Sequence, residues 1–441
     1  MKKFIIEQSD KEYYTGHFGL SLVGLCINEH TNLCKELSQR DGGEEKISTA
    51  EVVKSYLGLL CTGKSDYEAV ENMRRDEYFK AALDIDNVPS AATLRQRFDE
   101  RATYLEPVVC DSLVDPIKDV GAPVTGLETK HVPLDMDVFA LDNSNTKKEG
   151  VSRTYQGYDG YAPIAAYLGQ EGWCVAIELR EGKQHSQNNF IPFLKEAIDN
   201  ARKLTNKPLL VRLDSAHDSI DTLVTLKEAK KVSFIVKWNP RRDDVEQWKQ
   251  RAFKDGRVLT PRAGKRIAYL RVRKKRVHNG KTYFFTLVIR VTERTIAPDG
   301  QMMFFPDVEL EGWWTSLQMS EEHIIELYKG HAVCEQYHSE FKSDLDIERL
   351  PSGKFATNAL ILSLAALAYN ILRIIGQLGL IGFESPVRHK AKRRRIKTVI
   401  QELLYLAARL IRTGHRLKLR FGKYCPGYRA FEALYYRLST S

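Results

Sequence analysis

HVPLDMDVF, residues 131–139, alternates apolar side chains with Pro133, Asp135 and Asp137. A period of two is typical of a β-strand, because successive side chains point to opposite faces of the sheet. One face of this strand is therefore predicted to be buried, and the other is predicted to carry two carboxylates.

Further strands and helices follow this stretch along the chain. Two strand-like runs come first, and helix-like and strand-like runs then alternate. Three strands followed by such an alternation predict an α/β fold in which helices cover a mixed sheet. The runs are APIAAYLG (162–169), WCVAIELR (173–180), NNFIPFLKEAIDNARKL (188–204), PLLVRLD (208–214), SIDTLVTLKEAKK (219–231) and VSFIVKW (232–238).

Pattern and composition divide the chain into five regions. A single core tends to stop growing at about 250–300 residues, so 441 residues predict more than one domain. We predict a helical N-terminal domain, an α/β core in two parts, a basic β-rich insertion between those parts and a basic helical C-terminal region. In chain order they occupy residues 1–125, 126–245 (core), 246–310 (insertion), 311–385 (core) and 386–441.

Within the insertion, KRIAYLRVRKKRV and KTYFFTLVIRVT flank the tripeptide His278-Asn279-Gly280. Asn-Gly between strand-like runs is a strong signal for a tight hairpin. The two runs are therefore expected to pair.

No segment of the sequence predicts secretion or a membrane span. The apolar run 359–381 is interrupted by Ser363, Asn370 and Arg373, which favours a buried helix. The apolar run before Glu7 is too short for a signal peptide. The seven cysteines lack CxxC spacing and favour reduced thiols. We expect a cytoplasmic protein.

The net charge of +10 comes from two basic blocks. Residues 386–423 hold thirteen Lys/Arg against one acid, and residues 254–281 hold eleven against one. Clustered cations gain affinity for nucleic acid by releasing counterions from phosphates. A polyanion partner is the leading interpretation, although either block alone is compatible with an ordinary solvated face.

YKGHAVCEQYHSEFK, residues 328–342, has polar residues at an unusual spacing. On a helix, positions i, i+3, i+7, i+10 and i+14 fall along a single stripe. This stripe is predicted to face solvent, a cleft or a ligand. Its members are Tyr328, His331, Glu335, His338 and Lys342.

Three acids have the positions expected of a metal site. Asp137 lies on a strand, Asp214 ends the apolar run 208–214 and Glu335 lies on the polar helix. Carboxylates among apolar residues are costly unless they are paired or bind a cation. An all-oxygen donor set suits Mg²⁺ or Mn²⁺. Two such ions, about 3.5–4 Å apart, can promote phosphodiester chemistry.

This layout resembles the DDE transposases of bacterial insertion sequences, in the branch with the YREK signature. Tyr328, His331, Glu335 and Lys342 keep the spacing of that signature, with histidine in the arginine position. Three longer stretches resemble the insertion-sequence 1380 family in particular. They are EFKSDLDIERLPSGKFATNAL, KKEGVSRTYQGYDGYAPIAAYLG and VRLDSAHDS.

The resemblance implies an RNase H-like core in which Asp137, Asp214 and Glu335 bind two Mg²⁺ or Mn²⁺ ions. It implies cleavage of DNA at the terminal inverted repeats of the element, joining of the freed 3′-OH ends to target DNA, and a homodimer that synapses two ends. Residues 1–125 are then expected to bind DNA ends, in a nucleoid-associated protein. The expected DNA contacts are Tyr328, His331, Lys342, Arg273, Lys274, Lys275, Arg276, Lys392, Arg393, Arg394 and Arg395.

Several alternatives stay open at this point. Asp135 shares its strand face with Asp137 and could be the first metal ligand. Trp313 and Trp314 could stack on an extruded base, although adjacent tryptophans more often pack in a core. His217 and Asp218, just after Asp214, could assist the site, although a histidine and an aspartate at the start of a helix are more often caps or polar surface. An inactive DNA-binding protein and a metal-dependent nuclease without strand transfer are the alternative functions.

Overall fold

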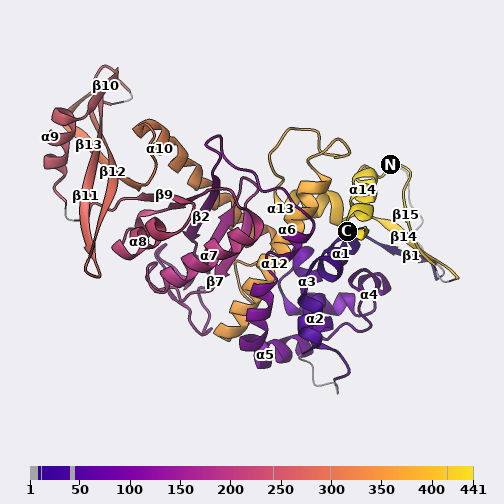
Figure 1. The fold of residues 1–441 in the computed structure, drawn as a ribbon. Helices are drawn as coiled ribbons and strands as arrows, with labels where there is room; N and C mark the ends of the chain where they lie inside the picture. The colour runs from indigo at the N-terminus through magenta and orange to yellow at the C-terminus, as the bar shows by residue number, and fades with distance from the viewer. Residues whose placement is uncertain are drawn as a thin grey trace.

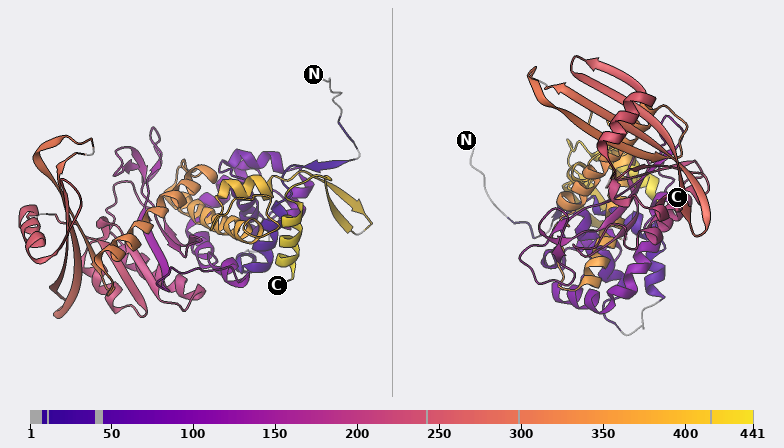
Figure 2. Two further views of the ribbon diagram at one scale, coloured as in Figure 1. Left: turned by 90° about the horizontal axis from the view of Figure 1, so that it is seen from above. Right: turned by 90° about the vertical axis from the view of Figure 1, so that its left-hand side faces the viewer.

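The computed structural model describes residues 8–10, 12–39, 45–241, 243–297, 299–414 and 416–440. The molecule is elongated, with a projecting β-sheet at one end, an α/β centre and a helical body at the other end (Figure 1, Figure 2).

The N-terminal part of the chain forms the helical body, as its sequence predicts. Ser90 caps the long helix of this part, since its hydroxyl accepts a hydrogen bond from the Thr93 amide at 3.1 Å. The elements are β1 (Tyr13–Thr15), α1 (Leu20–His30), α2 (Leu33–Ser38), α3 (Thr49–Cys61), the 3₁₀ helix η1 (Tyr67–Met73), α4 (Glu77–Leu83), α5 (Ala91–Asp111) and α6 (Asp115–Asp119).

The centre is a mixed sheet with strand order β7-β6-β2-β8-β9. Strands β2, β8 and β9 run parallel to one another, β6 runs antiparallel to β2, and β7 runs antiparallel to β6. The predicted mixed α/β fold is therefore confirmed. The strands are β2 (Val132–Val138), β6 (Ile164–Leu168), β7 (Trp173–Glu178), β8 (Leu209–Leu213) and β9 (Val232–Lys237), with helices α7 (Phe190–Leu204) and α8 (Ile220–Glu228) between them and the small sheet β3 (Leu141–Asp142), β4 (Ser152–Arg153) and β5 (Asp159–Tyr161).

The insertion continues this sheet to nine strands, because β13 pairs with β9 where Trp313 lies opposite Lys237. The predicted hairpin is confirmed: His278 lies opposite Lys281, and Asn279 and Gly280 between them have positive φ values of 47° and 75°. The elements are α9 (Val245–Asp255), β10 (Arg257–Arg262), β11 (Lys265–His278), β12 (Lys281–Ile296) and β13 (Met302–Thr315).

The polar stretch of the sequence forms a helical segment with changing winding. It consists of α10 (Glu321–Lys329), the 3₁₀ helix η3 (Gly330–Val333), α11 (Cys334–Ser339) and the π-helical turn η4 (Glu340–Asp344). Helix α12 (Phe355–Gly379) follows and packs against α3, α5 and β7. It is long and apolar enough to cross a membrane, but its most apolar window is entirely buried in the fold, as expected of a core helix.

The C-terminal region is only partly helical, so the prediction of a helical region is wrong here. It contains α13 (Ile396–Val399), the π-helical turn η5 (Ile400–Leu404), β14 (Ala408–Thr413), β15 (Arg416–Phe421) and α14 (Tyr428–Ser439). Strands β14 and β15 form a small sheet with β1. The run RLKLRF alternates cations with apolar residues, which is a strand pattern that the basic composition obscures.

Candidate active site

Asp137 lies at the carboxyl end of β2 and is largely buried. Its pKa is raised to about 6: burial is the largest cause, the carboxylates of Asp214 and Glu335 add to it, and His331 opposes it. The Asp137 carboxyl therefore responds to acids from two other segments of the chain.

Asp214 follows the neighbouring strand β8. Met136 lies opposite Leu213 in the parallel register, so Asp137 and Asp214 are the next residues of their strands. Their side chains meet at the carboxyl edge of the sheet, which is the usual ligand-binding edge of open α/β folds.

His217 fixes one oxygen of Asp214. Its Nδ1 lies 2.6 Å from Asp214 Oδ1, and its ring packs on Phe190 at a centroid distance of 4.1 Å. Burial of Asp214 opposes its charged form, but the hydrogen bond and charge of His217 outweigh this and hold its pKa below the usual range. His217 is fully buried, so its interpretation as a cap or as surface is wrong.

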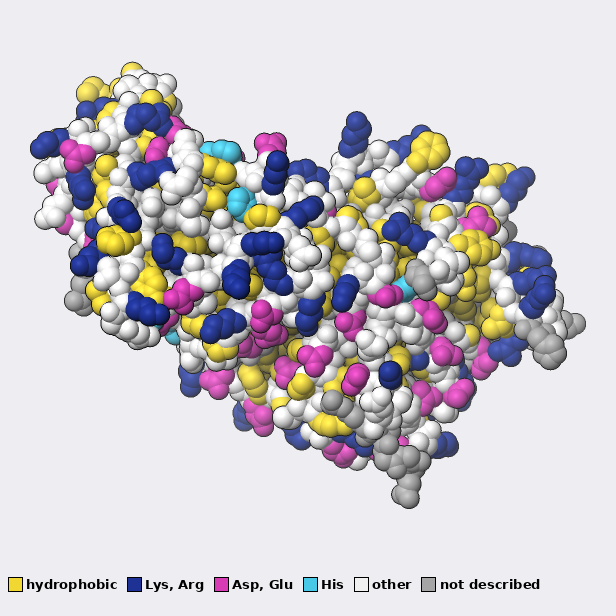
Figure 3. Space-filling view, viewed as in Figure 1, with side chains coloured by type: hydrophobic (Ala, Val, Ile, Leu, Met, Phe, Trp, Pro, Cys, Tyr) yellow, Lys and Arg dark blue, Asp and Glu magenta, His cyan; other side chains and the backbone are white. Residues whose placement is uncertain are grey.

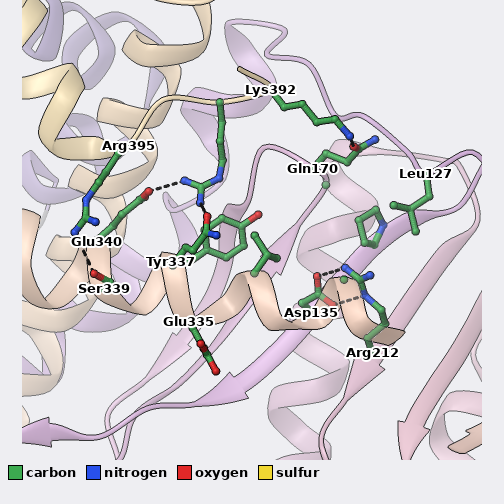
Figure 4. Close-up of a pocket in the computed structure, with 16 residues that line it drawn as sticks. Leu127, Asp135, Gln170, Arg212, Glu335, Tyr337, Ser339, Glu340, Lys392 and Arg395 are labelled. Carbon is green, nitrogen blue, oxygen red and sulfur yellow. Dashed lines mark hydrogen bonds and ion pairs between the residues drawn. The ribbon is translucent and has the colours of Figure 1, made fainter. Parts of the chain in front are cut away.

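Glu335 reaches the site from α11 and is exposed. Its carboxylate turns away from Asp135 and Arg212 (Figure 4). Its charge adds to the raised pKa of Asp137, and it is the third acid that the sequence predicts for the site.

Asp135 has a different environment although it shares the face of Asp137. Both of its oxygens accept from Arg212, at 2.6 Å from Nε and 2.6 Å from Nη2, and the pair is almost fully buried. Arg212 also donates to the Leu327 carbonyl at 2.7 Å. Asp135 thereby joins β2 and β8 to the end of α10, and Asp137 forms no such ion pair within the described chain.

The ligand atoms of Asp135, His331 and Cys334 lie within 4.8 Å of one another. A metal ion here would have to displace Arg212, which already uses both oxygens of Asp135. Burial, followed by the charges of Asp135 and Asp137, raises the pKa of the Cys334 thiol well above its usual range. This cluster is therefore a poor cation site.

The polar stripe of the sequence is not one open face. Glu335 is exposed, but His331 and His338 are buried, so the prediction of a stripe facing solvent, a cleft or a ligand is wrong for these two residues. The segment lies against the sheet, where His331 Nδ1 contacts Asp135 at 3.2 Å and His338 stacks on Phe139 at 4.3 Å. Burial lowers the pKa of His338 to about 3.

The other two members of the stripe differ in position. The Tyr328 ring lies 5.9 Å from that of His331, and burial, followed by the charges of Asp214 and Asp137, raises the pKa of its hydroxyl. The Lys342 Nζ instead lies 3.6 Å from Glu348.

Tyr155 is a residue that the sequence did not single out. Its hydroxyl donates to the Val138 carbonyl at 3.2 Å, and its side chain is 65% exposed. Burial of the hydroxyl end and the charges of Asp137 and Asp214 raise its pKa. The sequence signal for it is the tyrosine-rich run YQGYDGYAP, which begins with Tyr155.

Trp313 and Trp314 are buried, which contradicts a role in stacking on a base. Lys237 Nζ lies 4.2 Å from the centre of the Trp313 ring. The core interpretation is therefore confirmed.

The basic residues of β11 lie on the projecting sheet. Arg273 lies over Phe284 at 4.4 Å, and Lys274 lies over Trp248 at 4.6 Å. Lys275 and Arg276 are exposed near the hairpin. Lys and Arg side chains also gather across the middle of the face in Figure 3, between the projecting sheet and the helical body.

The second basic run, residues 392–395, has mixed exposure. Lys392 and Arg395 are exposed and Arg393 is half-buried, but Arg394 is buried. The Arg394 guanidinium donates to the carbonyls of Leu380, Val387 and His389. Arg394 thus lacks the exposure that a DNA contact requires.

A sequence family described as Transposase DDE domain group 1 matches residues 38–441. The chain belongs to this transposase family. Among solved structures, the transposase is similar to a piggyBac transposase synaptic complex with hairpin DNA, at 10% identity and a TM-score of 0.44, with 90% of this chain and 82% of that chain covered. A comparison with curated proteins finds no match.

DDE transposases as a family use divalent cations, and the acidic group of this transposase has the donor chemistry for them. Asp137, Asp214 and Glu335 offer only oxygen ligands, which hard cations such as Mg²⁺ prefer. Burial, and after it the charges of Asp214 and Glu335, raises the pKa of Asp137, and a bound cation would offset this cost of the charged carboxylate. The residues present therefore fit the group.

Proposed function

We propose that this chain cleaves DNA at the terminal inverted repeats of its insertion sequence and joins the freed 3′-OH ends to target DNA. Asp137, Asp214 and Glu335 are the proposed ligands of two Mg²⁺ or Mn²⁺ ions. The observation that carries this proposal is the adjacent ends of β2 and β8, which place Asp137 beside Asp214 in the parallel register, while the charge of Glu335 from α11 adds to the raised pKa of Asp137.

An RNase H-like core is part of the proposal. Its support is the strand order, with β2 between an antiparallel pair, β6 and β7, and a parallel pair, β8 and β9. Membership of the insertion-sequence 1380 family and of the YREK branch rests on the sequence stretches and on the spacing of Tyr328, His331, Glu335 and Lys342.

The side chains of the site have separate roles in this proposal. Divalent cations on the three carboxylates would supply an activated water and charge stabilisation for phosphodiester cleavage. His217 orients Asp214 through the 2.6 Å contact and fills the space behind it. Tyr328 and Tyr155 place hydroxyl groups beside Asp137 and Asp214, where they would contact phosphates next to the cut.

The proposed partner is double-stranded DNA, both the inverted repeats and the target. Arg273, Lys275 and Arg276 on the projecting sheet would contact its backbone, since phosphate contacts fix the register of a duplex without reading its sequence. The proposed active unit is a homodimer that holds two DNA ends.

The test is a cleavage and joining assay with the inverted repeats that flank the reading frame. With Mg²⁺ or Mn²⁺, the protein should release 3′-OH ends and join them to a second DNA. Asp214→Asn and Glu335→Gln should abolish both products, whereas Glu326→Gln, at an exposed glutamate of α10, should retain them.

Two outcomes would change the proposal. Cleavage without joining would indicate a nuclease of the same construction. Full activity of Glu335→Gln or Asp214→Asn would refute the site.

A further inference from the structure

A cavity of about 750 Å³ lies beside α11, and Glu335 is one of the residues that line it (Figure 4). The start of β2 and the turn after β6 form one wall, with Pro133 and Gln170. The helical segment forms a second wall with Gln336 and Glu340, and residues 392–395 close the third side. Of the three proposed metal ligands, Glu335 lines this cavity and Asp137 and Asp214 do not.

A buried arginine holds the third wall in place. Arg394 donates to three backbone carbonyls of its own loop, and its carbonyl accepts from the buried Arg373 at 2.5 Å. Because Arg394 turns inward, its neighbours Lys392, Arg393 and Arg395 all line the cavity. Three cations are thus presented from a fixed segment.

The arginine donors of this wall are held by the helical segment. The Arg393 guanidinium bonds to Glu340 at 2.5 Å and to Gln336 at 2.7 Å, and it lies 4.6 Å from the centre of the Tyr337 ring. Arg395 bonds to Asp344 and to Ser339. Such preorganised donors lose little conformational entropy when they bind an anion.

Positive charge exceeds negative charge around the cavity. Arg212 is balanced by Asp135 and Arg395 by Asp344, but Glu340 is shared between Arg393 and Arg373. Lys392 has a neutral partner, with its Nζ 2.8 Å from Gln170 Oε1. The cations around the cavity therefore outnumber the carboxylates, even when Glu335 is counted. The cations are Arg212, Arg373, Lys392, Arg393 and Arg395, and the carboxylates are Asp135, Glu335, Glu340 and Asp344.

We infer that this cavity binds a phosphodiester group of a DNA strand, held by Lys392 with Arg393 and Arg395. The inference rests on the proposed function, because it takes DNA as the substrate. Clustered, prepositioned guanidinium groups suit phosphate oxygens. Tyr337 is the one aromatic residue in the described wall, and Arg393 covers its face, so the wall offers no open ring on which a base could stack.

The strand would therefore cross the helical segment, with the scissile phosphate at Asp137 on one side and a neighbouring backbone phosphate at Lys392 on the other. Such a contact fixes the position of the strand and reads no sequence. Its expected signature is salt-dependent affinity that is independent of base sequence.

The test measures DNA binding by the full chain in EDTA, with fluorescein-labelled DNA of arbitrary sequence, as a duplex and as a single strand. Lys392→Gln should weaken binding several-fold and reduce the slope of log K against log salt by about 0.9 for duplex or about 0.7 for single-stranded DNA. Gln170→Glu, which places a carboxylate beside Lys392, should act in the same direction. Lys392→Arg should restore the slope.

Lys203→Gln is the matched control, because it removes the same charge from an exposed position on α7. A loss of slope on either form of DNA that exceeds the loss in this control supports the inference. Equal slopes for Lys392→Gln, Gln170→Glu and Lys203→Gln on both forms would overturn it. Catalysis is not measured in EDTA, so normal DNA binding by an inactive Asp214→Asn protein would leave the inference standing even if the cleavage proposal failed.

Discussion

The ion pair between Asp135 and Arg212 gives the sharpest stability prediction. Both oxygens of Asp135 accept from Arg212 at 2.6 Å, and both side chains are at most 5% exposed. Removing one partner of a buried pair costs about 3–5 kcal/mol, because the other charge is left uncompensated. Arg212→Met also leaves the Leu327 carbonyl without its donor.

We therefore expect Arg212→Met to lower the free energy of unfolding by about 3–5 kcal/mol at pH 7. His331, 3.2 Å from Asp135, remains as a second partner of that carboxylate, so the loss should lie toward the lower end of this range. The assay is urea unfolding followed by circular dichroism, with Lys203→Gln as the surface control. The double variant Asp135→Asn/Arg212→Met should lose much less than the sum of the two single losses, because it leaves no unpaired charge.

A loss below about 1 kcal/mol for Arg212→Met would refute the reasoning, since it would be typical of an exposed pair. Additive losses in the double variant would refute it as well. Either result would return Asp135 to consideration as a metal ligand.

Three further predictions concern the site and its surroundings. Asp137→Asn should raise the free energy of unfolding at pH 7 without divalent cations, by about 1–3 kcal/mol. The pKa of about 6 in the folded protein exceeds the ordinary value of 3.8, so the carboxylate costs stability as the pH rises between these values. The gain in Asp137→Asn should therefore vanish near pH 4 in urea unfolding. His217→Ala should lower the rate of DNA cleavage because Asp214 loses its 2.6 Å partner, and His217→Asn should recover part of that loss in the same assay; equal rates for the two variants would contradict a positioning role. Arg394→Gln should lower the thermal midpoint because its bonds to Leu380, Val387 and His389 are buried, whereas Lys392→Gln should leave the midpoint unchanged.

The β-sheet of the centre could be predicted from short-range pattern. Alternation in residues 132–138 and Asn279-Gly280 in the insertion are local signals, and strands form where those signals lie. The pairing of β13 with β9, which makes the insertion part of the same sheet, is a long-range choice that no local pattern contains.

The pairing of Asp135 with Arg212 could not be predicted from the sequence, because it depends on the register of two strands that are distant in the chain. The sequence did show Arg212 inside the apolar run PLLVRLD, and a buried arginine requires an acid. Which acid it meets follows only from the parallel register, in which Asp135 lies directly opposite Arg212. The choice between Asp135 and Asp137 could not be made without this information.

The helical stripe shows a second limit of sequence pattern. Regular spacing places residues on one side of a helix but does not say what covers that side. His338 meets Phe139 and His331 meets Asp135, while Glu335 between them stays exposed. The winding also changes, from 3₁₀ at Gly330–Val333 to a π-helical turn at Glu340–Asp344, which an ideal helical spacing does not anticipate.

The central claim is that Asp137, Asp214 and Glu335 together hold divalent cations. Mn²⁺ binding followed by electron paramagnetic resonance tests it most directly, because free Mn²⁺ is measured without DNA or turnover. Two Mn²⁺ ions should bind per wild-type chain, Asp137→Asn should lose binding and Glu326→Gln should bind as the wild type does. Wild-type binding in Asp137→Asn would refute the proposed ligand set.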